Sequence, residues 1–404
     1  MEHALKSKKF SFTLQWLLSV VCAIAVANLY YDQVLLSDIM KDFNIQPNQS
    51  GLILTVTQAG YTLGLLFIVP LGDRFNRRNL ILLSLLLSAF WLVMMTLASS
   101  FFLLLVFGFC LGFSTVSAQL IIPFVSSNLQ SEKKGKIIGR LLTGIFLGVL
   151  LGRVFGGWIG QLFNWETVHW VAACILLIFA CYLFVKLPDD QTQKQPSYKK
   201  IIQSLIPLLK EEPVLKEAIV FGVAAFAAFN IFWIPLTFIL NGAPYHFESG
   251  IIGMFGIIGI AGAITAGFTG QLSDSLHAQM WNIVALLLMI FSFVVLGIGW
   301  NHLYLLIAVT FLLDVGSRMN MSINQGRIYQ LAPENHSRLN SLYMVGYYFG
   351  GSIGSGIGSL SFHLGQVLGV VISGCLFLGF AIFYFWLSKK NSNFSKKKIG
   401  YYYR

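Results

Sequence analysis

Long apolar runs interrupted by short charged segments constrain this chain more than any other feature of its sequence. Residues 51–71 and 80–98 are almost entirely apolar, and the polar segment between them contains Asp73 and three arginines. A run of about 20 apolar residues is long enough to cross a bilayer, and a charge is costly at the bilayer centre. The sequence therefore predicts two membrane helices joined by a tight turn, which the arginines place on the cytoplasmic side.

The composition extends this interpretation to the whole chain. Of its 404 residues, 56% are hydrophobic and only 11% are charged, whereas soluble domains carry about 25% charged residues. The net charge of +11 would suit a nucleic-acid binder, but the lysines and arginines fall in short segments between apolar runs. That pattern is typical of membrane orientation. We therefore expect a polytopic protein embedded in the lipid bilayer, without nucleic acid as a partner.

Twelve apolar runs are long enough to be membrane spans. They cover approximately residues 12–36, 51–71, 80–98, 101–125, 137–162 and 168–187, then 218–240, 250–270, 280–299, 303–323, 342–364 and 367–387. With both termini in the cytoplasm, 24 of the 27 lysines and arginines lie in cytoplasmic segments, and the outer loops hold only Lys41. Basic residues favour the cytoplasmic side, so this orientation is predicted.

Residues 188–214 separate two sets of six spans. The segment is polar at first and then amphipathic, with Ile201, Leu205 and Leu209 at helical spacing beside several lysines. Such a helix would lie on the anionic inner surface of the membrane; the alternative is a solvated linker with one apolar face. The predicted domains are an N-terminal six-helix half (1–187), a cytoplasmic linker with an amphipathic helix (188–214), a C-terminal six-helix half (215–388) and a basic cytoplasmic tail (389–404).

The two halves are internal repeats. A shift of 202 residues places Asn28 on Asn230 and superposes four glycines of the fifth span on four of the eleventh. Two repeated six-helix halves enclose a central site at their interface. The superposed glycines are Gly144, Gly148, Gly152 and Gly156 on Gly346, Gly350, Gly354 and Gly358.

The turn at residues 71–78, LGDRFNRR, and the repeated halves resemble the major facilitator superfamily over essentially the whole chain. The resemblance implies an all-α membrane protein in which twelve transmembrane helices form two pseudo-twofold six-helix halves. The turn motif of the family has glycine where this chain has Val69 and Asn76. Asparagine tolerates the left-handed backbone of a tight turn, so Asn76 is a mild departure, whereas Val69 is a larger one.

The resemblance also implies a conformational role for this turn, at the cytoplasmic junction of the two halves. The carboxylate of Asp73 would hold a helix N-terminus or a cation in one conformation and release it in another. The alternative is that the arginines only set the topology. The predicted latch residues are Gly72, Asp73, Arg74, Arg77 and Arg78.

Glycines recur every four residues in the fifth span. They form a small-residue face that allows helices to approach closely. They also match the antiporter motif of the family, except that the proline of the motif is Arg153 here. The match favours export by antiport, and helix packing alone explains the pattern equally well. The residues concerned are Gly148, Gly152, Gly156 and Gly157.

Four ionisable residues lie within predicted spans, where charge is costly and a functional role is the default interpretation. Asp314 falls near the middle of the tenth span, and Arg318 follows on the same helical face, so the two can pair. Asp32 and Arg153 fall at similar depths in the first and fifth spans, which suggests a second pair. An aspartate between apolar surface and a cation can bind and release a proton. We therefore predict that all four serve proton coupling, with Asp314 as first candidate; structural ion pairs are the alternative.

Amide and aromatic residues are the candidates for substrate binding. The resemblance implies that spans one, two, four, five, seven, eight, ten and eleven line a central cavity. A pocket of amides, aromatic rings and few charges suits an amphiphilic organic solute, although each aromatic residue alone is more typical of packing or of the membrane interface. The predicted substrate-binding residues are Asn28, Tyr31, Gln119, Asn230, Trp233, Asn324, Gln325 and Tyr347.

Motifs for catalysis and metal binding do not occur. The chain has no Walker A sequence and no H-E-x-x-H, and residues 350–354 fit G-x-S-x-G only inside an apolar, glycine-rich run without a strand. The seven histidines are scattered among termini and loops, and the five cysteines lie in apolar runs without motif spacing. We expect no enzyme, no metal and no cofactor, with a proton gradient as the energy source.

Together these features predict a secondary transporter of small organic solutes that works by alternating access in the plasma membrane, most simply a bacterial inner membrane. Residues 28–33, NLYYDQ, and 324–329, NQGRIY, resemble prokaryotic efflux-type members of the family, so a proton-coupled efflux antiporter is favoured. The alternatives are a proton-coupled uptake symporter for a sugar, an organic acid or a siderophore-like ligand, and a non-transporting receptor or sensor. The fold needs one chain only, so we expect a monomer.

Overall fold

The computed structural model describes residues 12–128, 134–189, 198–269, 272–273, 275, 277–331 and 336–402. Every regular element in this part of the chain is helical, as predicted for an all-α membrane protein. Some residues used for the predicted orientation and linker lie outside the described residues. They are Lys6, Lys8, Lys9, Lys133, Lys194, Arg404 and residues 190–197, together with the side chains of the tail at 389–404.

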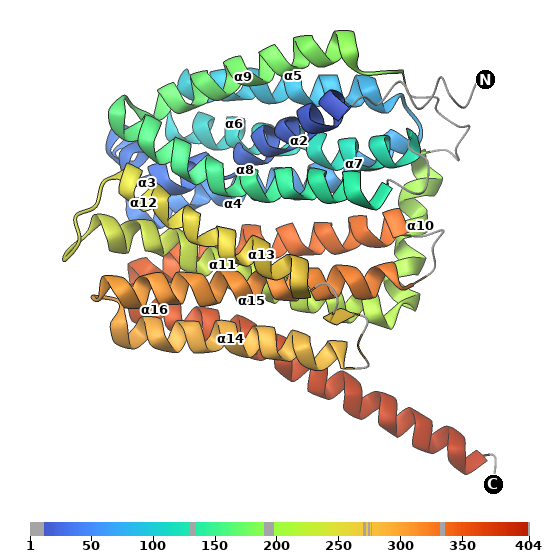
Figure 1. Ribbon diagram of the computed structural model, residues 1–404. Coiled ribbons are helices and arrows are strands. Elements are labelled where there is room, and N and C mark those ends of the chain that lie inside the picture. Colours follow the sequence, from blue (N-terminus) through green and yellow to red (C-terminus); the bar gives the residue numbers. More distant parts are fainter. Residues whose placement is uncertain are drawn as a thin grey trace.

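The N-terminal part of the chain forms one layer of helices, coloured blue to green at the top of Figure 1. Two of its predicted spans are interrupted, between α2 and α3 and between α6 and α7. The elements are α2 (Phe12–Ala27), α3 (Tyr31–Phe43), α4 (Pro47–Phe67), η1 (Val69–Asp73), α5 (Arg77–Thr96), α6 (Phe101–Ser114), α7 (Ser117–Asn128), α8 (Lys134–Leu162) and α9 (Trp165–Lys186).

The C-terminal part forms the second layer, coloured yellow to red in Figure 1, and α10 runs across one end of both layers. Its elements are α10 (Tyr198–Glu211), α11 (Pro213–Asn241), α12 (Ser249–Met254), η3 (Phe255–Ile258), α13 (Gly259–Thr269), α14 (Ala278–Gly299), α15 (Leu303–Tyr329) and α16 (His336–Tyr402). The tyrosine hydroxyl of Tyr198 in α10 donates to the Phe67 carbonyl at 2.9 Å, which ties the linker helix to the first layer.

Within the described residues, ten helices are long and apolar enough to cross a membrane. The last of them, Arg338–Ser388, contains two predicted spans, because α16 leaves helical geometry at Gly365 and Gln366. The predicted span 250–270 is divided into α12, η3 and α13. Glycine costs about 1 kcal/mol relative to alanine inside a helix, and this stretch carries a glycine every three residues from Gly250 to Gly262. The arrangement is consistent with twelve crossings.

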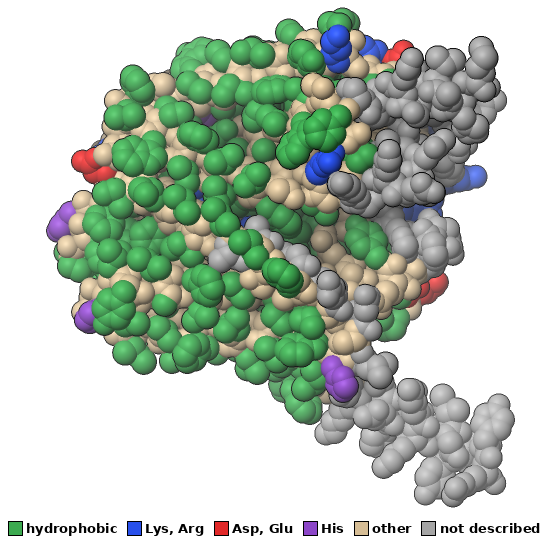
Figure 2. All heavy atoms as spheres, viewed as in Figure 1, with side chains coloured by type: hydrophobic (Ala, Val, Ile, Leu, Met, Phe, Trp, Pro, Cys, Tyr) green, Lys and Arg blue, Asp and Glu red, His purple; other side chains and the backbone are tan. Residues whose placement is uncertain are grey.

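Large apolar side chains cover the outside of the helices. Figure 2 shows hydrophobic side chains spread over both layers on the visible face, with few charges among them. Phe102, Phe268 and Ile298 are among the most exposed. A surface of this kind is matched to lipid, where the backbone groups must be satisfied inside the helices.

The two layers are closely joined at the end of the molecule where α3 ends and α12 begins. The Thr237 hydroxyl of α11 donates to the Gln33 carbonyl at 2.8 Å, and the Ser249 hydroxyl of α12 donates to the Gly157 carbonyl at 3.3 Å. Helix α8 makes more extensive contact with α12 than with α13. The layers therefore approach most closely at this end, which is the outer end in the predicted orientation.

Candidate functional site

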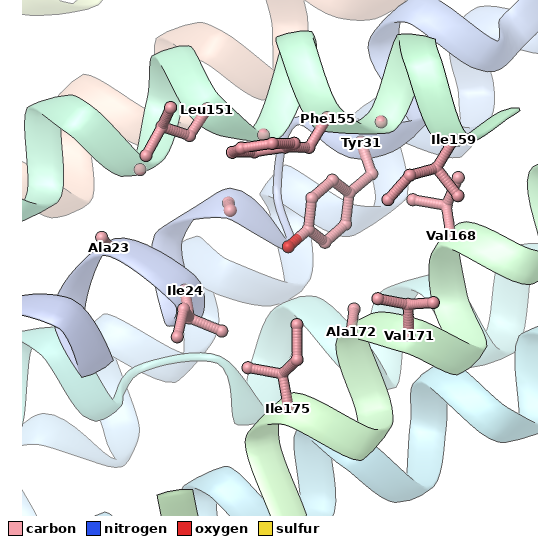
Figure 3. A pocket seen from close by; sticks show the side chains of 14 residues that line it. Ala23, Ile24, Tyr31, Leu151, Phe155, Ile159, Val168, Val171, Ala172 and Ile175 are labelled. Atoms are coloured by element: carbon pink, nitrogen blue, oxygen red, sulfur yellow. The ribbon is translucent and has the colours of Figure 1, made fainter. Parts of the chain in front are cut away.

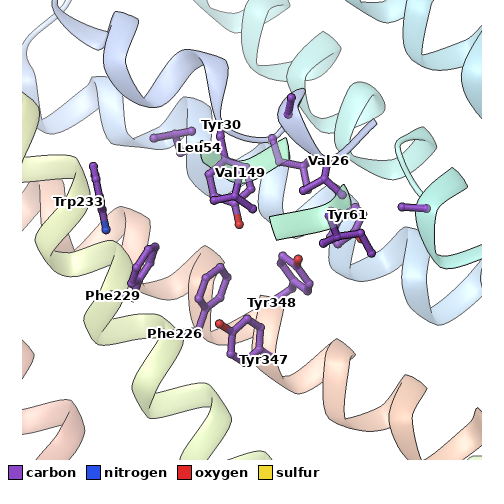
Figure 4. Close-up of a cluster of buried hydrophobic side chains, with 14 of the residues drawn as sticks. Val26, Tyr30, Leu54, Tyr61, Val149, Phe226, Phe229, Trp233, Tyr347 and Tyr348 are labelled. Atoms are coloured by element: carbon purple, nitrogen blue, oxygen red, sulfur yellow. The ribbon is translucent and has the colours of Figure 1, made fainter. Parts of the chain in front are cut away.

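Two arginines and one aspartate are buried between the layers, surrounded by aromatic rings. We call Arg153, Asp314, Arg318, Tyr30, Phe229 and Trp233 the central cluster. Figure 4 shows Tyr30 and Tyr61 from the first layer facing Phe226, Phe229, Trp233, Tyr347 and Tyr348 from the second. The exposed fraction is 1% for Arg153 and 0% for Asp314, so both charges are sealed from solvent in this conformation.

The break between α2 and α3 decides which neighbours the consecutive residues 30–33 contact. Residues 28–30 form a turn, in which the Tyr30 amide donates to the Ala27 carbonyl at 2.9 Å. Asn28 is buried there, and its amide oxygen and nitrogen have no hydrogen-bond partner among the described residues. Interrupted membrane helices commonly border transport sites, and here the interruption brings Tyr30 to the central cluster.

Arg153 is fixed by a hydrogen bond and by an aromatic ring. Its Nε donates to Gln33 Oε1 at 2.8 Å, and its guanidinium carbon lies 3.7 Å from the centre of the Trp233 ring. Tyr30 and Phe229 face it at 5.1 and 5.5 Å. Cation–π contacts at these distances are attractive. They hold the guanidinium in one orientation, while its Nη2 has no hydrogen-bond partner among the described residues.

Asp314 and Arg318 meet on α15, as their spacing predicts. Arg318 Nε lies 3.9 Å from Asp314 Oδ2, which is an ion pair beyond hydrogen-bonding distance. Neither carboxylate oxygen of Asp314 has a hydrogen-bond partner in the described part of the chain. The carboxylate faces the backbone of Gly259 and Gly262, where an added Cβ would contact or strike it. The glycine-rich eighth span thus makes room for this side chain.

The predicted pair between Asp32 and Arg153 is wrong. Asp32 Oδ1 lies 3.1 Å from His169 Nε2 of α9, and both side chains are buried. Neighbouring residues on a helix point about 100° apart, so Gln33 faces α8 and Arg153 while Asp32 faces α9. His169 was assigned to a loop by its position at the edge of a predicted span. The sequence signal for His169 is that the carboxylate of Asp32, within an apolar span, needs a partner that can carry positive charge.

Other predicted residues connect the layers around the cluster. Gln58 Nε2 of α4 donates to Asn230 Oδ1 of α11 at 2.9 Å. The rings of Phe226 and Tyr347 stack at 4.1 Å, and Gln119 lies beside the Tyr61 hydroxyl. Asn230, Trp233, Gln119 and Tyr347 therefore lie around the interface of the layers, and their role in substrate binding stays a prediction.

Asn324 and Gln325 lie elsewhere. Asn324 belongs to a closed ring of three buried amides, in which Asn282 donates to Asn324 at 2.8 Å, Asn324 to Asn320 at 3.1 Å and Asn320 to Asn282 at 3.2 Å. The ring joins α14 to α15, and each amide in it donates once and accepts once, so Asn324 fits a packing role better than substrate binding. Gln325 Nε2 lies 3.4 Å from Asn340 Oδ1 of α16.

Tyr31 points away from the central cluster. Its side chain lies in an apolar pocket of about 260 Å³ between α2, α8 and α9, bordered by Ile24, Phe155 and Ala172 (Figure 3). Phe155 is exposed on the outside of the layer, so this pocket opens toward lipid. The predicted substrate contact of Tyr31 is therefore corrected: the turn at residues 28–30 places Tyr30 inward and Tyr31 outward.

The predicted latch lies where η1 meets the second layer. Asp73 Oδ1 accepts a hydrogen bond from Arg77 Nη2 at 3.0 Å, and Gly72 is buried in η1. Asp73 and Arg77 border a small pocket together with Arg338 and Ser341 of α16. The other arginines stay within the first layer: Arg74 lies over the Phe75 ring, and Arg78 donates to Asp189 at 2.7 Å and to the Phe184 carbonyl.

The glycines of α8 stand at close helix contacts. A Cβ at Gly148 or Gly152 would meet the backbone of Ala23 or Ala27 in α2, and one at Gly156 would meet Tyr31. Gly157 faces the other layer, and a Cβ there would strike the Ser249 carbonyl of α12. Among the described residues, no group of three or more His, Cys, Asp or Glu side chains could hold a metal ion.

Two helical layers with charged residues buried at their interface are the arrangement typical of secondary membrane transporters. The chain belongs to the Major Facilitator Superfamily, whose sequence profile matches residues 16–300 and 281–400. Proteins of this family are transporters and not enzymes, and the chain is an integral membrane protein of this kind.

Relatives and solved structures agree with this assignment. The uncharacterized transporter YgaY of Escherichia coli O157:H7 is 32% identical over 89% of this chain and 91% of its own length. A protein of Helicobacter pylori strain 26695, named a probable sugar efflux transporter, is 25% identical over 88% of this chain and 90% of its own length. The crystal structure of a bacterial homologue of the human lysosomal transporter Spinster, in an inward-facing and occupied conformation, shares the fold. Its TM-score is 0.77 at 13% identity, covering 94% of this chain and 96% of that one.

Proposed function

We propose that this chain is a proton-coupled secondary transporter of small organic solutes that works by alternating access in a bacterial inner membrane. The observation that carries the proposal is the buried Asp314–Arg318 pair between the layers, with both carboxylate oxygens lacking a hydrogen bond among the described residues. We further propose that it functions as a monomer with both termini in the cytoplasm, that the proton gradient supplies its energy, and that no cofactor takes part.

The loose ion pair suits a group that alternates between two states. When the carboxylate of Asp314 is ionised, Arg318 compensates its charge at 3.9 Å. When Asp314 binds a proton, that attraction is lost, and Arg318 is free to turn toward other partners. A buried charge left without its partner is costly, so the change in protonation supplies a free-energy difference between two arrangements of the cluster. Such a difference is what couples proton binding to a change of conformation.

Efflux by antiport is the first candidate for the direction of transport. Relatives from Helicobacter pylori are named probable sugar efflux transporters, and the glycines of α8 match the antiporter motif except at Arg153. Uptake by symport is the second candidate. It is favoured by the excess of positive charge in the central cluster, because an anion attracted by the arginines and a proton on Asp314 would bind together.

The proposal is tested by luminal pH in energised inside-out vesicles challenged with sugars, organic acids, lipophilic cations and siderophores. We expect one compound class to move protons with the wild type, and no movement with empty vesicles or with Asp314→Asn. Asp189→Asn, which changes an exposed carboxylate at the start of the linker, is the control and should retain activity.

The sign of the pH change separates the two candidates. Proton release from the lumen on substrate addition outside supports antiport, and proton movement in the same direction as the substrate supports symport. Wild-type proton movement in correctly inserted Asp314→Asn would refute the role of Asp314. Binding without any flux would instead indicate a receptor or sensor.

A further inference from the structure

The central cluster has more positive than negative groups. Arg153 and Arg318 carry two positive charges, and among the residues that the structure describes the one carboxylate in contact with the pair is Asp314. The other titratable groups that face the arginines are tyrosines: Tyr30 from the first layer, and Tyr347 and Tyr348 from α16. Helix α11 contributes only the apolar faces of Phe229 and Trp233. The Asp32–His169 pair compensates itself on the other side of α3.

An uncompensated positive charge in this position requires an explanation. Arg153 is 1% exposed, its Nε is bound to a neutral amide, and its Nη2 has no partner among the described residues. A buried charge without a counter-charge is among the most costly features of a membrane protein. Ionisable residues buried in membrane proteins mark substrate and ion pathways, so a ligand is a candidate for the missing partner of Arg153.

The geometry of Arg153 is suited to a carboxylate. Trp233 supports one face of the guanidinium at 3.7 Å and Gln33 holds Nε at 2.8 Å, so the side chain is preorganised and loses little conformational entropy when a ligand binds. The guanidinium edge presents paired donors that match the two oxygens of a carboxylate. Aromatic rings of Tyr30, Phe229 and Trp233 surround this edge and would contact the organic body of the ligand.

We infer that the transported substrate is an organic anion whose carboxylate binds Arg153, with Arg318 as the second cation of the site. This inference rests on the proposed function, because it assigns the substrate class of that transporter. Arg153 is thereby a substrate-binding residue and not a member of the proton-coupling set. Asp314 and the substrate carboxylate compete for Arg318, so the anion is bound best when Asp314 is protonated. Anion and proton then travel in the same direction, which favours the symport alternative.

The test compares acids with their uncharged counterparts on the purified, full-length protein. Benzoate is paired with benzamide and gluconate with glucose, and binding is measured as ligand-induced thermal stabilisation, which increases with ligand concentration relative to Kd. We expect at least one acid to stabilise the wild type and its uncharged counterpart to do so at least about tenfold more weakly, since charge-assisted bidentate bonds are the strong ones.

The variants locate the binding to Arg153. Arg153→Gln should weaken binding of the acid about tenfold or more, and Arg153→Lys, which keeps the charge without the planar fork, should weaken it less. Arg140→Gln is the matched control, because Arg140 lies on the same helix, donates to Gln15 at 3.1 Å and stacks on Phe12 and Trp16. If Arg153→Gln does not fold, Arg153→Lys still provides the test. A smaller preference in binding affinity for the acid over its uncharged counterpart than in the wild type supports the inference, and an unchanged preference contradicts it.

Two results would overturn the inference: uncharged compounds that bind as tightly as their acids, or acid binding that survives Arg153→Gln at the affinity of the Arg140→Gln control. The proposed function fails separately. Acids that bind through Arg153 without any proton movement in vesicles would refute proton coupling and keep the substrate class. Proton movement driven by glucose, without binding of gluconate, would keep proton-coupled transport and refute the substrate class.

Discussion

At the scale of single residues, the hydrogen bond from His169 to the backbone fixes how its buried ring faces Asp32. His169 Nδ1 is 3.0 Å from the Trp165 carbonyl oxygen, which can only accept a hydrogen bond, so Nδ1 carries hydrogen. Nε2 lies 3.1 Å from Asp32 Oδ1, and this oxygen has no hydrogen-bond partner among the described residues, so the two groups form a close electrostatic contact. Two buried polar side chains, one from α3 and one from α9, thus face each other away from solvent.

This buried contact leads to a prediction on stability. Replacing either partner alone, by His169→Leu or Asp32→Leu, leaves the other buried without its counterpart and should destabilise the protein by about 3–5 kcal/mol. The double replacement should cost clearly less than the sum of the two, because it removes both polar groups. Thermal melting in detergent at constant pH measures the cycle. Strictly additive losses would show that the two side chains do not interact.

At the scale of elements, hydropathy predicts which segments form membrane helices but not where those helices are interrupted. The lengths of the spans can be predicted from the thickness of the bilayer. The contact between Asp314 and Arg318 can be predicted from their spacing along one helix. The turn at residues 28–30 has no glycine or proline to mark it, and it decides that Gln33, not Asp32, meets Arg153. The amide ring of Asn282, Asn320 and Asn324 depends on the packing of α14 against α15, which no local pattern encodes.

The contact of α8 with α12 leads to a prediction on conformation. Gly157 lies so close to the Ser249 backbone that any side chain would clash, so Gly157→Val should open the outer end of the molecule. Spin labels on Lys41, at the end of α3, and on His246, in the loop before α12, report the separation of the layers there. We expect a longer mean distance in Gly157→Val than in the wild type.

The control for this measurement lies on the same helix. A Cβ at Gly139 would meet nothing within 4 Å, so Gly139→Val changes helix propensity and bulk without touching the other layer. It should leave the label distance unchanged. An equal shift in both variants would mean that the outer contact of Gly157 does not hold the layers together.

At the scale of the whole molecule, the outer contacts and the η1 turn are at opposite ends of the two layers. Alternating access requires that contacts at one end form while those at the other break. At the η1 end, Asp73 and Arg77 border the same pocket as Arg338 and Ser341 of α16, whereas Arg78 pairs with Asp189 at the start of the linker. The two arginines are adjacent in sequence, but of the two ion pairs only Asp73–Arg77 lies at the junction of the layers.

Because of this difference, one experiment can distinguish a conformational role of Asp73 from a role of the cytoplasmic turn in setting the membrane topology. Asp73→Asn removes the charge that faces Arg77 and the start of α16, so transport should fall at least about tenfold, while substrate affinity, set in the central cluster, stays near the wild-type value. Asp189→Asn breaks an exposed pair, worth about 0–1 kcal/mol, and should leave transport nearly unchanged. Initial rates of substrate-linked proton movement in vesicles, beside thermal-shift affinities of the purified variants, give both quantities. Equal losses of transport in the two variants would assign Asp73 to the stability or orientation of the cytoplasmic loop. An equal loss of substrate affinity and transport rate in Asp73→Asn would place its effect at the substrate site and not in the conformational change.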